Sequence, residues 1–522
     1  MSHFRWLVLM DTDRIKDYIF ATNRLKEIRG ASLLLDRLNT QKSRDLLADF
    51  DGEEVFIGGG GVLATFPDQA RAEGYMAAVQ AAYRKETHIA TITGVAVPIP
   101  PGAGGEQGAL RRVRAELRLA KGARAKTQAL LTSPYFRLCQ SCNCYPVVCI
   151  DKGDEICQAC HAKREEAEQR AFPPYSGYSK FARRALALYG DDRWQRLTWV
   201  PAKLDRLEGP DTSHIGFIHA DVNNLGAFLE QQGSLADIEV LGKKVEEALE
   251  GALVDAVRKV GLKPRRRDDG KEGWPFLIII MGGDDITLIV PAKCAVPLAN
   301  ELCLAYEERI KAALGEATDV QGDPVGKLAL SAGVVIAKPA HPAYALADRA
   351  EDLVRSAKRR SRELEAKGYG PIPTLDFQVV HTPTANPVQE VREEEYFQER
   401  NGQRYWYTFR PLPCRPIGPL PGVNTLLDTI RSLRRSNFPR SKLNEWADLI
   451  YTSEIEQILS WQVLQARVTG EAHRALCRMI SDFGLVRERV FAQPGGVGEP
   501  YITPLLDLIE LYDFVEVEET HD

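Results

Sequence analysis

The sequence predicts an α+β protein of several domains, and three features of the chain lead to this prediction. One series of elements occurs twice: a strand ending in an acid, a helix, a hairpin with a glycine-rich turn, a helix, a strand and a basic helix. Two Cys-x-x-Cys motifs lie between the copies, and a helical pattern without the repeat follows them. The length of 522 residues allows about two to four domains.

The first copy is expected within residues 1–130. Its strand Trp6–Asp11 ends in an acid, and apolar residues then recur at helical spacing from Ile15 to Leu38. A hairpin follows around Gly58 to Gly61, and a basic helix containing Lys121 ends the copy. Glycines permit a tight turn but supply no metal ligand, so we interpret this copy as a degenerate partner.

The second copy is expected within residues 213–378. The strand Phe217–Asp221 again ends in an acid, and the later hairpin turns at Gly282-Gly283-Asp284-Asp285 between apolar, β-branched strands. Adjacent carboxylates in such surroundings repel each other and lose solvation, and a divalent cation is the usual compensation. The alternative for the hairpin alone is an ordinary solvated turn, since Asp and Gly are common there.

Asp221, Asp284 and Asp285 are predicted to meet at one edge of a sheet and to bind two Mg²⁺ (or Mn²⁺) ions for phosphoryl transfer. Neighbouring side chains of an extended chain point to opposite faces. We therefore expect Asp221 and Asp285 to be direct ligands, with Asp284 assisting them or deprotonating the attacking hydroxyl.

A nucleotide site is predicted beside these acids. Its expected residues are the helix-opening N–H groups of Val222, Asn223 and Asn224, the turn glycines Gly282 and Gly283, and the basic Lys358 and Arg362. A helix N-terminus binds phosphate, and residues four apart share one helix face. The glycines would let a base or ribose lie against the turn. For the basic helix alone, the alternative is a solvated face.

A zinc module is expected within residues 131–172, where six of the ten cysteines lie. Cys139, Cys142, Cys157 and Cys160 form two Cys-x-x-Cys knuckles, which together give the four ligands of a structural zinc site. Cys144, Cys149 and His161 are alternative ligands, and buried or redox-active thiols are the alternative to zinc. Four thiolates leave no open position for chemistry, so the predicted zinc is structural.

The rest of the chain is predicted to be a helical connector, 173–212, and a separate helical domain, 379–522. No apolar run reaches the ~18 residues of a membrane helix, and no secretory signal opens the chain, so a cytoplasmic location is expected. The net charge of −5 gives no general indication of nucleic-acid binding.

The Gly-Gly-Asp-Asp hairpin resembles the palm domain shared by nucleotide cyclases, diguanylate cyclases and polymerases. The whole order of modules resembles the large subunit of type III CRISPR effector complexes, with support from segments such as 26–32 and 331–334. The resemblance implies two ferredoxin-like palm domains with the zinc module between them. It also implies synthesis of cyclic oligoadenylate from ATP when a complex of protein subunits and guide RNA binds target RNA. Asp221, Asp284 and Asp285 match the family's metal positions, and Lys358 matches its phosphate-contacting lysine.

The sequence departs from many members in one respect. It starts at the first palm copy, without the N-terminal histidine–aspartate nuclease domain, and the His521-Asp522 pair has no such context. We therefore expect no DNase activity. Two other functions stay open: a scaffold that binds nucleotide without turnover, and a stand-alone cyclase that makes a mononucleotide or dinucleotide signal, including from GTP.

Overall fold

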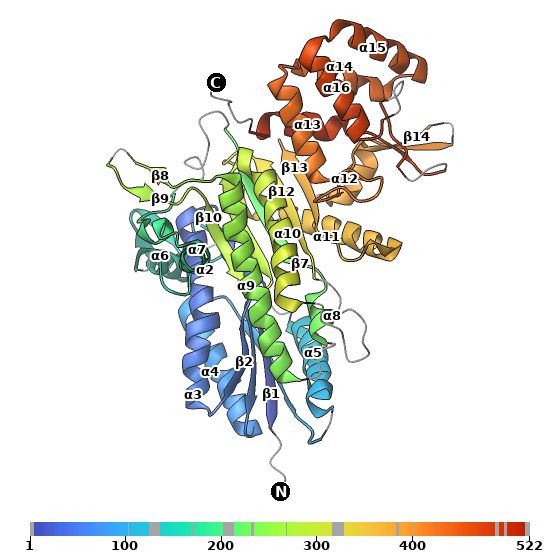
Figure 1. Ribbon diagram of the computed structural model, residues 1–522. Coiled ribbons are helices and arrows are strands. Elements are labelled where there is room, and N and C mark those ends of the chain that lie inside the picture. The colour runs from blue at the N-terminus through green and yellow to red at the C-terminus, as the bar shows by residue number, and fades with distance from the viewer. Residues whose placement is uncertain are drawn as a thin grey trace.

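The computed structural model describes most of the chain. The described residues are 5–102, 104–124, 136–169, 172–201, 213–230, 234–267, 269–315, 328–382, 386–400, 402–485, 490–494 and 498–516. Figure 1 shows the first copy in blue, the second in green and yellow, and the C-terminal region in orange and red.

The first copy is a four-stranded antiparallel sheet with helices on both faces. The strands lie in the order β2 (Glu53–Gly58), β3 (Gly61–Phe66), β1 (Trp6–Thr12) and β4 (Ile92–Pro98). Side chains of neighbouring residues in β1 belong to different cores, since Leu7 packs with α5 and Val8 with the larger core. The helices are α1 (Ile15–Ile19), α2 (Leu25–Arg37), the π-helical turn Leu38–Lys42, α3 (Ser43–Asp49), α4 (Gln69–Thr87) and α5 (Gly105–Arg124).

The second copy repeats this sheet and extends it. Its strand order is β10 (Leu277–Gly282), β11 (Asp285–Pro291), β7 (Ile215–Val222), β12 (Leu330–Ala337), β13 (Thr374–Val380) and β16 (Leu412–Pro413). The helices are α8 (Leu225–Glu230), α9 (Leu235–Val260), α10 (Ala292–Leu314) and α11 (Ala343–Leu364), followed by a π-helical turn, Glu365–Tyr369. Figure 1 shows α9 and α10 running side by side along the molecule.

Glycines let two helices approach the second sheet from opposite faces. A Cβ on Gly216 would lie 2.2 Å from the Cβ of Ala295 on α10. A Cβ on Gly333 would lie 2.3 Å from the carbonyl oxygen of Ala350 on α11. Gly333 pairs with His219, three residues from Gly216, so these two glycines face opposite sides. Helix α11 thus covers the face that carries His219.

The two copies correspond residue by residue around their turns. Asp11 pairs with Gly61 in the first copy, as Asp221 pairs with Asp285 in the second. Each hairpin also carries a β-bulge three residues before its turn, at Val55 and at Ile279. The predicted α+β fold with two related domains is confirmed.

The cysteine-rich module consists of β5 (Cys149–Asp151), β6 (Asp154–Ile156) and α6 (Gln158–Gln169), and α6 packs on α2. Next come α7 (Gly177–Tyr189), which packs on α9, and a 3₁₀ turn, Arg193–Arg196. A short hairpin, β8 (Arg265–Arg266) and β9 (Glu272–Gly273), precedes β10.

The C-terminal region is mainly helical. Its helices are α12 (Val388–Glu395), α13 (Val423–Arg435), α14 (Arg440–Asp448), α15 (Glu454–Arg467), α16 (Gly470–Asp482) and α17 (Leu505–Leu511), with 3₁₀ turns at Leu449–Tyr451 and Tyr512–Phe514. A small sheet of β14 (Phe397–Arg400), β15 (Gln403–Trp406) and β17 (Tyr501–Ile502) accompanies them. Helix α13 buries Val423, Leu426, Leu427, Ile430 and Leu433, the spacing of an amphipathic helix.

The predicted domain boundaries stay predictions. Residues 125–135 and 202–212, where two of them fall, and His521-Asp522 lie outside the described residues. The boundary at 378 falls inside β13, and β16 adds to the same sheet beyond it. Among the described residues, none of the helices combines the length and apolar character needed to cross a membrane.

Candidate active site

The sheet brings Asp221 and Asp285 together. Asp221 is the penultimate residue of β7, Asp285 is the first residue of β11, and the two are direct partners across antiparallel strands. Direct partners project from the same face, with Cβ atoms about 4.5–5.5 Å apart. Asp284 lies in the turn, and its carbonyl oxygen accepts the N–H of Val222 at 3.0 Å. The turn is therefore tied to the end of β7.

The surroundings of the three carboxylates disfavour the charged forms of Asp284 and Asp285. Burial, and next the charge of Asp221, raise the pKa of Asp284 from 3.8 to about 6. Burial, and next the charges of Asp284 and Asp221, raise the pKa of Asp285 well above its usual value. Burial and the neighbouring negative charges both disfavour the ionised forms, and a nearby cation would act against both effects.

Lys358 supplies part of that charge. Its Nζ atom lies 2.7 Å from Oδ1 of Asp221 and donates to the carbonyl oxygen of Val222 at 3.1 Å. Lys358 lies on helix α11, which covers this face of the sheet, and its side chain reaches the end of β7.

The acids have the chemistry of a magnesium or manganese site but are not arranged around one point. Carboxylate oxygens are the ligands that these ions prefer. Among the described residues, the group whose ligand atoms all lie within 4.8 Å of one another consists of cysteines and not of these aspartates. Lys358 bonds Oδ1 of Asp221, one of the two oxygens that this carboxylate could offer to an ion. The roles of the aspartates as ligands stay predictions.

The phosphate site expected after Asp221 differs in the structure. The N–H of Val222 is taken by Asp284, and the N–H of Asn223 donates to the carbonyl oxygen of Ala329 at 2.7 Å. Asn224 has a left-handed φ of 57°, and helix α8 begins only at Leu225. As a correction, the N–H groups of Val222 and Asn223 are engaged within the protein and do not open a helix towards a phosphate.

The structure also places the other residues expected at the nucleotide site. Arg362 is exposed, its Nε donates to the carbonyl oxygen of Lys358 at 3.3 Å, and it lines a separate groove with Arg359. It is thus not gathered with the aspartates. A Cβ on Gly282 would lie 3.1 Å from the Cα of Gly59, and one on Gly283 would lie 3.6 Å from it. The turn of the first copy therefore lies against these glycines, while Gly282 also lines the cavity, so their contact with a base or ribose stays a prediction.

The first copy has the same lysine–aspartate ion pair as the second but lacks the two aspartates of the turn. Lys121 of α5 bonds the carboxylate of Asp11 and donates to the carbonyl oxygen of Thr12 at 3.2 Å. This repeats the contacts of Lys358 with Asp221 and Val222. Sequence reasoning noted Asp11 and Lys121 but did not assign them to a site; aligning the two copies at these positions would have done so.

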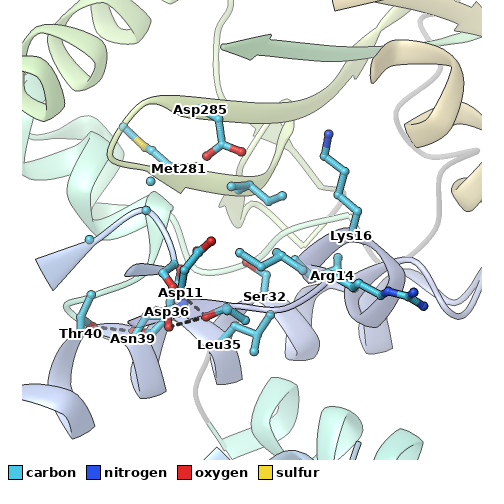
Figure 2. A pocket seen from close by; sticks show the side chains of 18 of the residues that line it. Asp11, Arg14, Lys16, Ser32, Leu35, Asp36, Asn39, Thr40, Met281 and Asp285 are labelled. Carbon is cyan, nitrogen blue, oxygen red and sulfur yellow. Dashed lines mark hydrogen bonds between the residues drawn. The ribbon is translucent and has the colours of Figure 1, made fainter. Parts of the chain in front are cut away.

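A cavity of about 410 Å³ lies where the two glycine turns meet. Figure 2 shows Asp11 and Asp36 of the first copy below Asp285 of the second, and the side chain of Lys16 rising to one side of them. Burial raises the pKa of Asp36 to about 7, although the charge of Lys180 acts against this. Sequence reasoning missed Lys16 and Asp36, because nothing in their helical pattern distinguishes them from other surface charges.

The cysteine cluster fits zinc. The sulfur atoms of Cys139, Cys142, Cys157 and Cys160 all lie within 4.8 Å of one another. The sulfurs of Cys142 and Cys157 are 3.8 Å apart, the separation expected in a tetrahedron with Zn–S bonds of about 2.3 Å. The alternative ligands are not part of this group, although Cys144 and Cys149 lie close to it. Cys144 is exposed, Cys149 bonds the carbonyl oxygen of Ile156, and His161 lies 3.7 Å from Glu165.

The module also holds the helices beside the cavity. Lys163 is fully buried, and its Nζ donates to the carbonyl oxygen of Tyr18 in α1 at 2.5 Å. Arg164 bonds Glu27 of α2 at 2.7 Å and also Asp151 and Asp154. The cysteine cluster is thus connected to α1 and α2.

Known proteins similar to this chain were found by family model and by structure. Residues 214–365 match the family model described as the second palm domain of Cas10/Cmr2. No curated protein matches the chain.

Among solved structures, a crystal structure of Csm1 in T. onnurineus is 14% identical, with a TM-score of 0.52 over 98% of this chain and 70% of that one. A Csm1–Csm4 cassette in complex with pppApApA is 14% identical, with a TM-score of 0.48 over 92% and 70%. A cassette in complex with cA4 is 15% identical, with a TM-score of 0.44 over 73% of this chain; the chain spans 55% of that relative's length.

At 14% identity, the likeness to Csm1 shows the fold. The family match is more specific, because it includes the strands that carry Asp221 and Asp285, the turn that carries Asp284 and the helix that carries Lys358. The predicted resemblance to the large subunit of type III CRISPR effector complexes is thereby confirmed. Residues 214–365 of this chain are thus similar to the second palm domain of the Cas10/Cmr2 family.

Proposed function

We propose that this chain is the large subunit of a type III CRISPR effector complex and that it joins ATP into cyclic oligoadenylate with release of pyrophosphate. The observation that carries the proposal is the pairing of Asp221 with Asp285 beside Asp284, in a Cas10/Cmr2 palm domain that faces a second copy of its own fold.

In this reaction, Asp221 and Asp285 would hold two Mg²⁺ or Mn²⁺ ions, which activate the attacking 3′-hydroxyl and neutralise the triphosphate. Lys358 would pass from Asp221 to a phosphate once the ions balance the carboxylates. The first copy would hold the second nucleotide in place, so that a 3′-hydroxyl lies against an α-phosphate.

The proposed partners are further protein subunits and, through them, guide and target RNA, in the cytoplasm. A scaffold that binds nucleotide without turnover is the main competing function. A stand-alone cyclase with another product, including one from GTP, is the second.

The test is mass spectrometry of the products formed from ATP and Mg²⁺, first by the chain alone and then by the chain with its co-purified subunits and target RNA. We expect cyclic oligoadenylate, and its loss in Asp284→Ala/Asp285→Ala. Asp45→Ala/Asp49→Ala, on the exposed side of α3, is the matched control and should stay active.

The other outcomes separate the alternatives. ATP binding without product in either preparation would support the scaffold and contradict the proposal. A cyclic mononucleotide or dinucleotide, or a product from GTP alone, would identify the stand-alone cyclase.

A further inference from the structure

Lys16 extends from the first copy into the second. It lies in α1, and its Nζ atom is 3.0 Å from Oε2 of Glu351 on α11 and 3.1 Å from Nε2 of His219 on β7. Figure 2 shows its side chain rising from the ribbon of the first copy towards the strands of the second. The ammonium group is thus fixed by two residues of the other copy.

Those contacts place the ammonium group beside the carboxylates. His219 lies two residues before Asp221 and pairs with Thr287, which lies two residues after Asp285. Residues two apart in a strand share a face and are about 7 Å apart, so the His219–Thr287 pair adjoins the Asp221–Asp285 pair on one face. Nδ1 of His219 lies 3.1 Å from Oγ1 of Thr287, which orients the ring with Nε2 towards Lys16.

Lys16 is one of three cationic residues in a cavity that five acidic residues also line. Lys16 lines the cavity together with Asp285 and Glu351, and its side chain is 27% exposed. An ammonium group has three N–H donors, and the described contacts with His219 and Glu351 use two of them. The other cavity lysine, Lys180, is bonded to Glu246 at 2.6 Å.

We propose that Lys16 is a substrate-binding residue, whose ammonium group contacts phosphate oxygens of a nucleotide in the cavity between the two copies. The inference rests on the proposed function, because it takes a nucleoside triphosphate as the ligand of this cavity. It adds a residue that the first copy supplies to the site of the second.

The test is calorimetric titration of the full chain, in Mg²⁺, with α,β-methylene-ATP, AMP and adenosine. Lys16→Met should weaken α,β-methylene-ATP binding about tenfold or more, AMP less, and adenosine hardly at all, because a charge-assisted hydrogen bond to phosphate is lost. Lys16→Arg should restore most of the affinity. Lys85→Met, which removes an exposed lysine of α4, is the matched control and should bind like the wild type.

Glu351→Gln distinguishes a phosphate-binding role of Lys16 from a purely structural ion pair that links the two copies. It removes the acid partner but leaves the lysine, so ATP-analogue affinity should be unchanged or tighter. If Lys16→Met and Glu351→Gln lower the melting temperature equally and leave the affinity unchanged, Lys16 serves only as a structural ion-pair partner and the inference is wrong.

The two proposals fail in different ways. Cyclic oligoadenylate from the wild type with unchanged analogue affinity in Lys16→Met would overturn the inference alone. Lys16-dependent analogue binding without any product would support the inference while the synthase activity fails. No binding of the analogue to the wild type would overturn both.

Discussion

Asp11 with Lys121 and Asp221 with Lys358 are two versions of one ion pair at the end of a strand. In the first copy, Lys121 faces Asp11 and, at 3.7 Å, Asp13, because Gly60 and Gly61 occupy the positions of Asp284 and Asp285. In the second copy, Lys358 bonds one of three carboxylates, and Lys16 is a second positive charge that acts on Asp285. The carboxylates of the second copy therefore still outnumber the lysines, and both turn aspartates have raised pKa values.

This charge imbalance predicts how magnesium affects stability at different pH values. The folded-state pKa of Asp284, about 6, is above the usual 3.8, so folding without metal takes up a proton between about pH 4 and pH 6. Stability without metal falls as pH rises through that window, and Mg²⁺ should compensate only where the carboxylates are charged. We expect Mg²⁺ to raise the melting temperature clearly at pH 8 and little at pH 5, as measured by thermal unfolding.

Asp285→Asn provides the matching variant. It removes a repelled, desolvated charge, so the metal-free protein should gain on the order of 1 kcal/mol at pH 8 and should lose the stabilisation by Mg²⁺. Asp45→Asn on α3 should change neither quantity. A less stable Asp285→Asn protein that still responds to Mg²⁺ would contradict the charge imbalance.

Individual site residues were predictable where the strand pattern governs them. Asp221 and Asp285 meet because both end or begin apolar strands. The phosphate-binding N–H groups were not predictable, because the left-handed Asn224 delays the helix and the adjoining strand uses the earlier donors. The spacing of four residues predicted that Lys358 and Arg362 share one helix face. It could not predict how far each side chain lies from the aspartates.

Helix α2 shows how one element depends on a distant one. A Cβ on Gly30 would lie 1.7 Å from the carbonyl oxygen of Lys163 in α6, so only glycine allows these helices to pack as they do. The sequence gives no sign of this contact, because the two residues are far apart in the chain. Helical spacing predicted α2 itself, since apolar periodicity is local.

Gly30→Ala should therefore destabilise the protein by about 2 kcal/mol or more, since backbone must move to relieve the overlap. Gly108→Ala is the matched control: it also lies within a helix, α5, but a Cβ there meets nothing within 4 Å. We expect this change to stabilise slightly, because alanine favours helix over glycine. Chemical denaturation of both variants measures the difference, and equal effects would contradict the contact.

At the scale of the whole molecule, the cysteine-rich module supports one wall of the cavity. It is attached through Lys163 and Arg164 to α1 and α2, which carry Lys16 and Asp36. The order of the modules was predictable from motifs. The meeting of the two glycine turns was not, because it joins residues more than two hundred positions apart that no periodic pattern relates.

Metal removal tests this support. Purified protein should contain about one zinc ion per chain, and a strong chelator should lower the melting temperature by roughly 5 °C or more, because metal binding contributes to folding. Cys157→Ser should do the same. Cys144→Ser and Cys477→Ser, at exposed cysteines, should keep both the zinc content and the melting temperature. Full zinc content in Cys157→Ser would show that the ligand set is different.

The contact of Gly59 with Gly282 and Gly283 joins two walls that belong to a single polypeptide. A cavity formed by two separate chains is lost on dilution below their dissociation constant. Here both walls stay at a fixed local concentration, whatever the amount of protein. Ligand affinity at this cavity should therefore be independent of protein concentration. The two walls also differ in their residues, since Asp285 lines one and Asp11 and Asp36 line the other, so two ligands bound against them would have different surroundings.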